Sequence, residues 1–115
     1  MGDSDMNFKK KAIRSPQHLA YVRSRPCMIS GDEGRMVVAH HLLRAGGKGM
    51  GIKACDSLVV PLTSFLHDML HRNGNEVSFF ANHGLSYEKV LDIAKNLARN
   101  SPDIEIRNKD ESNEN

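Results

Sequence analysis

Apolar and polar residues follow two different rhythms along this chain, and each rhythm predicts a different kind of element. In the first half, short apolar runs rich in valine predict strands over residues 36–40 and 58–60. Pro61 directly follows the second run and is expected to end that strand, because proline cannot donate to a sheet ladder. A glycine-rich loop, residues 46–51, separates the two strands.

In the second half, apolar residues recur every three or four positions, the spacing of amphipathic helices. Three helices are expected there, over residues 62–72, 76–82 and 86–99. An earlier helix is predicted to begin at Ser15 and Pro16, because serine caps helices and proline favours their first position. The predicted order is helix, strand, loop, strand and three helices, which is an α+β arrangement.

The length and composition of the chain allow one modest domain, since 115 residues with 39% hydrophobic content cannot form two independent cores. Residues 15–100 are expected to form this domain. Residues 1–14 are expected to be a mobile basic arm and residues 101–115 a disordered acidic tail, because both ends lack hydrophobic periodicity.

Charge is distributed unevenly between the two ends of the chain. Residues 1–25 contain six basic and two acidic residues, whereas residues 101–115 contain two basic and five acidic ones. A basic arm suits contact with a phosphate backbone, and a solvated arm explains the same composition. The arm residues expected to contact nucleic acid are Lys9, Lys10, Lys11 and Arg14.

The sequence carries no signal for membrane insertion or export. It has no run of about 18 apolar residues, so no membrane span is expected. The basic residues near the start are not followed by an apolar stretch, so no secretory signal is expected. Two cysteines, Cys27 and Cys55, in such a chain indicate a reduced, cytoplasmic setting rather than a disulfide framework.

Four of the six histidines fall where the predicted elements can gather them. His67 and His71 are four apart on a predicted helix, so their rings project from one face and can chelate one metal ion. His40 and His41 end a predicted strand, where neighbouring side chains point to opposite faces. One of this pair can therefore face the helix and bind metal, while the other serves a different feature of the site.

Each histidine pair alone is weak evidence, since histidines are common on helix surfaces and at strand ends. Together, within one strand–loop–strand–helix unit, they favour a metal site over unrelated surface residues. The two remaining histidines lie outside this unit: His18 is expected on a helix surface and His83 near a helix end. Phe79 and Phe80 are expected in the core.

These motifs resemble those of the HNH endonuclease superfamily, whose core, the ββα-metal fold, consists of two strands and a metal-bearing helix. The similarity extends from Pro26 to Leu97 and is closest to phage-encoded HNH nucleases, including recombination-enhancement nucleases. The matching motifs are Ala39-His40-His41, Gly49-Met50-Gly51-x-Lys53-x-x-Asp56, Val60-Pro61-Leu62, His67-x3-His71 and Gly74-x-Glu76-x-x-Phe79.

The resemblance implies a hairpin packed on a metal-bearing helix, with helices flanking it on the N- and C-terminal sides. It implies that His40, His67 and His71 bind one divalent metal ion and that His41 is the general base for the attacking water. Asp56 takes the place of the central Asn in the family's name, which holds the loop in shape by side-chain to backbone hydrogen bonds. Zinc, magnesium, manganese and nickel are the candidate metals, and the ligands alone do not select among them.

Further residues near these motifs have both a functional and a purely structural interpretation. Arg44, the second expected catalytic residue, follows the expected base by three positions and suits a phosphate, while Lys48 and Lys53 in the glycine loop suit the DNA backbone. A solvated surface charge is the alternative for all three. Glu76 either hydrogen-bonds a ligand histidine or simply occupies a favourable helix N-terminus.

The chain departs from relatives that carry a structural zinc on four cysteines. Cys27 keeps one of the four positions, but Ser30, Thr63 and Leu66 occupy the other three. Since these are poor zinc ligands or none, no second zinc is expected. Dimerisation or the extra helices would then supply the lost stabilisation, so a homodimer is left open.

The leading hypothesis is therefore a metal-dependent endonuclease that hydrolyses DNA with low sequence specificity and derives from a phage or prophage. Backbone contacts are expected to dominate, because no recognition helix is available to read base edges. One alternative is a catalytically degenerate nucleic-acid-binding module of a phage recombination or packaging assembly, against which the intact His41 argues. Another is a small structural metal protein, against which the basic arm argues.

Overall fold

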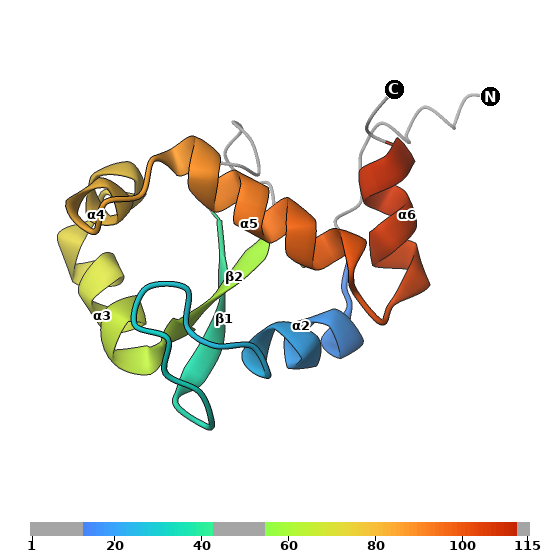
Figure 1. Ribbon diagram of the computed structural model, residues 1–115, viewed down its shortest axis with the longest axis horizontal. Coiled ribbons are helices and arrows are strands. Elements are labelled where there is room, and N and C mark those ends of the chain that lie inside the picture. The colour runs from blue at the N-terminus through green and yellow to red at the C-terminus, as the bar shows by residue number, and fades with distance from the viewer. Residues whose placement is uncertain (1–12, 43–54, 113–115) are drawn as a thin grey trace.

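The computed structural model describes residues 13–42 and 55–112, and within them five helices surround a two-stranded antiparallel sheet (Figure 1). The α+β fold class predicted from the sequence is confirmed. In chain order the elements are α2 (Pro16–Arg23), β1 (Val37–His41), β2 (Val59–Thr63), α3 (Ser64–Asn73), α4 (Glu76–Asn82), α5 (Tyr87–Arg99) and α6 (Ile104–Ser112).

Side-chain caps explain where four of these helices begin. In each case the residue before the helix accepts a hydrogen bond from a backbone N–H of the first turn, which would otherwise have no partner. Ser15 caps α2, with Pro16 at its first position, and Ser86 caps α5. Thr63 and Asn75 cap α3 and α4 in the same way.

β1 and β2 pair in the register Val37 with Thr63 and His41 with Val59, and α3 follows β2 without a connecting loop. The strand was predicted to end at Pro61 and the helix to begin at Leu62, and both predictions were wrong: Pro61 and Leu62 lie within β2. Pro61 continues β2 because each strand of a two-stranded sheet has an open edge, where a missing N–H costs no ladder bond. The helix begins only after Thr63, whose side chain caps it.

The core lies between the sheet and the helices on either side of it. α3 and α4 lie on one side of the sheet and α2 on the other, while α5 runs from α4 to α6 and also packs on β2 (Figure 1). Phe79 and Phe80 are buried, as predicted. Of the apolar stripe predicted on α3, Leu66 and Leu70 are buried, but Phe65 is 64% exposed. The main core cluster comprises Cys27, Leu42, Val60, Leu62, Leu66, Leu70, Phe79, Phe80, Val90 and Ala94.

The predicted disordered tail is wrong for residues 101–112. This segment forms a turn followed by α6, and Ile106 is completely buried. The Oγ of Ser15 donates a hydrogen bond to the carboxylate of Asp103, so the segment is tied to the start of α2. This helix could not be predicted from periodicity, because α6 is mostly polar and has one apolar anchor rather than a periodic stripe. Residues 113–115 lie outside the described residues.

His18 is another corrected expectation, because it is completely buried rather than on a helix surface. Its Nδ1 lies 2.8 Å from the Oγ of Ser101, whereas its Nε2 has no hydrogen-bond partner among the described residues. Burial lowers the pKa of His18 below its ordinary 6.5, and this outweighs the attraction of Asp103 and Asp56. The neutral form of the ring is therefore the one that fits the fold.

Several residues expected to contact nucleic acid lie outside the described residues. These are Lys9, Lys10, Lys11, Arg44, Lys48 and Lys53, together with the glycine-rich loop. In the part of the chain that the structure describes, no helix has the length and apolar character needed to cross a membrane.

Candidate metal centre

His40 enters the site from β1 and is buried, whereas His67 is half-buried and His71 exposed. It pairs with Val60 on β2 and is 2% exposed. Its ring lies edge-on to the rings of His67 and His71, with centroid separations of 5.1 and 6.0 Å. The strand therefore directs His40 toward α3, as the alternation of strand side chains allows for one member of the His40-His41 pair.

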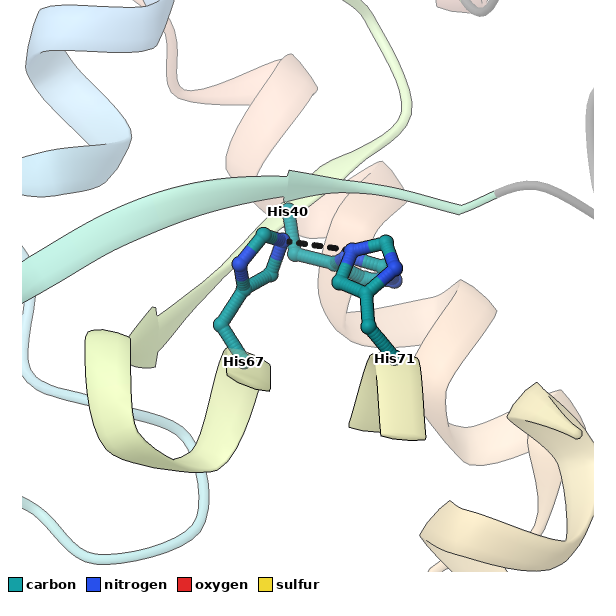
Figure 2. A group of neighbouring side chains, drawn as sticks. All are labelled: His40, His67 and His71. Atoms are coloured by element: carbon teal, nitrogen blue, oxygen red, sulfur yellow. Dashed lines mark hydrogen bonds between the residues drawn. The ribbon is translucent and has the colours of Figure 1, made fainter. Parts of the chain in front are cut away.

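His67 and His71 lie one turn apart on α3 and face the same direction (Figure 2). Their Nε2 atoms are 3.2 Å apart. Two imidazole nitrogens bound to one tetrahedral zinc, each at about 2.0–2.1 Å, stand about 3.3 Å apart. The helix thus holds this pair at the spacing that a shared ion requires.

Together the three histidines form a group that fits a divalent metal ion. One ring nitrogen from each of His40, His67 and His71 lies within 4.8 Å of the others, and they are the only such group of three found among the described residues. Three imidazoles suit a transition-metal ion and leave coordination positions open. Burial lowers the pKa of His67, and the neighbouring His40 and His71 lower it further, so its neutral, metal-binding form is favoured.

A buried carboxylate stands behind His40. Oε2 of Glu76, in the first turn of α4, lies 2.8 Å from Nε2 of His40, and both side chains are at most 4% exposed. The hydroxyl of Tyr87 donates to the other oxygen, Oε1, at 2.8 Å. Of the two sequence-based readings of Glu76, the structure shows the hydrogen bond to a predicted ligand histidine.

His41 points away from this group and meets a different carboxylate. Its Nε2 lies 2.7 Å from Oδ1 of Asp56, and its side chain is 31% exposed. Oδ2 of Asp56 accepts the backbone N–H of Ser15 at 2.8 Å, and Arg14 approaches Oδ1 at 3.5 Å. Asp56 thus accepts a backbone N–H, but from Ser15 before α2; the loop it was expected to hold lies outside the described residues. Asp56 also holds His41, a pairing that was not predicted from the sequence.

Asp56 is ionised at neutral pH. Burial by itself would raise its pKa, but the hydrogen bonds from His41 and from the backbone of Ser15 outweigh burial, and the net pKa is lowered. Its backbone N–H donates to the carbonyl of Ile13 at 3.1 Å, so the residue is fixed through both backbone and side chain. The result is a histidine–carboxylate pair on the opposite face of β1 from the three clustered histidines.

The cysteines play no visible part in either feature. Cys27 is buried and accepts a backbone hydrogen bond from Ser30 at 3.4 Å, and Cys55 is half-buried beside Ser57; both are free thiols. His83 ends α4 as its C-cap, as expected.

Comparison with known proteins gives a match to a family. The searches of curated proteins and of solved structures found no match. Residues 6–98 match the family described as "Protein of unknown function (DUF968)", and this segment includes all three clustered histidines, the His41–Asp56 pair and Glu76. The match spans well over half of the chain, and the chain therefore belongs to the DUF968 family.

Proposed function

We propose that this protein is a metal-dependent endonuclease of the HNH type that cleaves DNA with low sequence specificity. One observation carries the proposal. Adjacent residues of β1 serve two arrangements, His40 joining His67 and His71 of α3 while His41 pairs with Asp56 on the other face. Hydrolysis of a phosphodiester needs these two functions side by side, a bound cation and a base for water.

The role of general base falls to His41. The Asp56 carboxylate accepts hydrogen bonds, so it holds the proton of the His41 ring on Nε2 and leaves Nδ1 with a free lone pair. That nitrogen can take a proton from water, and the ionised Asp56 stabilises the imidazolium that results. The partial exposure of His41 gives solvent access to the ring.

The three clustered histidines would hold the metal ion. When bound, the ion would act as a Lewis acid on the scissile phosphate and stabilise charge on the leaving oxygen. Because all three ligands are neutral, they would leave the positive charge of the ion uncompensated, which favours an anionic substrate. His40 is supplied by the strand and the other two by the helix, so the packing of α3 on β1 sets the ligand spacing.

The arrangement of elements supports the same assignment. A short antiparallel sheet runs directly into a helix that carries two candidate ligands, which resembles the ββα-metal core of HNH nucleases. No described element has the features of a base-reading helix, so contacts to the phosphate backbone would provide affinity. Arg14, half-exposed beside Asp56, is the described member of the predicted nucleic-acid-binding set.

A plasmid-nicking assay with zinc, magnesium, manganese or nickel tests this proposal. We expect the wild-type protein to nick supercoiled DNA with at least one metal, and His41→Ala to lose that activity while still binding metal. His83→Ala is the matched control, because His83 is an exposed histidine at a helix end, away from both arrangements. A wild-type protein that binds DNA but is inert with every metal would instead indicate a degenerate binding module.

A further inference from the structure

We propose that Glu76 is a positioning residue for the metal centre: it fixes the tautomer of His40, so that His40 binds the ion through Nδ1. This inference rests on the proposed metal site. It goes beyond that site because it assigns a role to a residue outside the ligand group and chooses between the two ring nitrogens of a ligand.

The first step concerns the hydrogen bonds of the Glu76 carboxylate. Oε1 accepts from the hydroxyl of Tyr87, and Oε2 faces Nε2 of His40, each at 2.8 Å. A carboxylate only accepts hydrogen bonds, so the proton in the bond to His40 belongs to the ring. Nε2 therefore carries the hydrogen, and Nδ1 is the ring nitrogen with a lone pair for a metal ion.

The second step concerns burial. Glu76 and His40 are both buried, so neither group can exchange its partner for bulk water. A buried carboxylate without partners is costly, which favours keeping both hydrogen bonds. The N-terminus of α4 adds a partial positive charge beside the carboxylate. The orientation of the His40 ring is thus set before any ion arrives.

The third step is the contrast with the other two ligands. His67 and His71 turn their Nε2 atoms toward each other at 3.2 Å. The site would therefore bind an ion through two Nε2 atoms from α3 and one Nδ1 atom from β1. A carboxylate on the far nitrogen of a ligand imidazole also makes the ring a stronger donor, and removal of such partners commonly lowers metal affinity by about 10- to 100-fold.

A zinc-binding titration against a competing chelator separates this role from a purely structural one. Glu76→Gln keeps the shape of the side chain but offers only one acceptor oxygen to Tyr87 and His40. We expect it to bind zinc about 10- to 100-fold more weakly than wild type. Glu88→Gln is the matched control, since Glu88 lies in the first turn of α5 and is exposed. It removes the same helix-terminus charge and should leave zinc affinity unchanged.

Nitrogen-15 spectra of the wild-type histidine rings provide the second measurement. Without metal, we expect His40 to carry its proton on Nε2. When zinc binds, the resonance of Nδ1 should shift in His40, whereas in His67 and His71 the resonance of Nε2 should shift. Equal zinc affinity of Glu76→Gln and wild type would overturn the inference, as would zinc on Nε2 of His40. If Glu76→Gln does not fold, the spectra of the wild-type protein still decide. A wild-type protein that binds no zinc would overturn the metal site itself.

Discussion

Replacing Asp56 by Asn should slow catalysis by orders of magnitude without disturbing the metal ligands. Oδ2 of Asp56 receives the backbone N–H of Ser15, which can only donate, so the oxygen of the new amide must occupy that position. Its NH2 group is then forced toward Nε2 of His41, at the present Oδ1 position. An amide that donates to Nε2 moves the ring proton to Nδ1, and the atom that should accept the proton of water is blocked.

The size of the effect follows from these contacts. A corresponding Asp-to-Asn change in a serine-protease triad, which also leaves the histidine in the wrong tautomer, lowers the rate by about 10⁴-fold. General-base catalysis as such contributes about 10²- to 10⁴-fold, so we expect a loss in that range. The free energy of unfolding should fall by only about 1–2 kcal/mol, because the hydrogen bond from Ser15 is kept. The loss comes from the contact with His41, which no longer involves a charged carboxylate.

Single-turnover plasmid nicking, together with a zinc titration, measures both halves of this prediction. We expect slow nicking and unchanged zinc affinity for Asp56→Asn, with Asp92→Asn, an exposed aspartate on α5, as the charge-matched control. Nitrogen-15 spectra should show the proton of His41 on Nδ1 in the variant. Nicking within about threefold of wild type, with the tautomer changed, would refute the assignment of His41 as base.

Three further predictions concern metal binding, pH and the C-terminal segment. Free zinc at 100 times its dissociation constant should raise the free energy of unfolding by about 2.7 kcal/mol, and His67→Ala should remove this gain in thermal unfolding. Without metal, stability should decline as the pH falls below 6.5, because the folded state lowers the pKa of His18 and resists its protonation. Urea unfolding of His18→Gln at pH 5.5 and 7.5 should show a smaller decline, and a decline equal to that of wild type would contradict the burial argument. Ile106→Ala should cost about 2–5 kcal/mol by urea unfolding, whereas a disordered segment would give no change.

The helix limits could largely be predicted from the sequence because their signals are local. Ser15-Pro16 begins α2, Asn73-Gly74 ends α3, and Ser86 begins α5, as the sequence indicated. Gly74 has a positive φ of 78°, which glycine adopts without strain. Such patterns act within a few residues and do not depend on the rest of the fold.

Burial of the C-terminal segment and of His18 could not be predicted, because it depends on contacts between distant parts of the chain. His18 and Ser101 are 83 positions apart, and Ser15 and Asp103 are 88 apart. No periodic pattern marks a single apolar anchor such as Ile106 or a histidine whose partner is a serine from another helix end. Tertiary packing decides these positions, not local propensity.

The candidate site also combines features with a local sequence signal and features that depend on long-range contacts. The four-residue spacing of His67 and His71 is a helical pattern, and the sequence predicted that they would share a face with one histidine of β1. The carboxylates behind the histidines were harder to assign, because Glu76 lies 36 positions from His40 and Asp56 lies 15 from His41. The sequence offered a ligand histidine as one possible partner of Glu76, but the choice of His40, and the pairing of Asp56 with His41, became clear only from the fold.

The tie between Ser15 and Asp103 has a consequence for a shortened protein. Ser15 donates its backbone N–H to Asp56, which holds His41, and its hydroxyl to Asp103. Asp103 lies 32 residues beyond His71, the last of the clustered histidines. Proteolysis after residue 100 would therefore keep all three candidate ligands but remove the anchor of Ser15. On the proposed function, such trimming would weaken DNA cleavage more than metal binding.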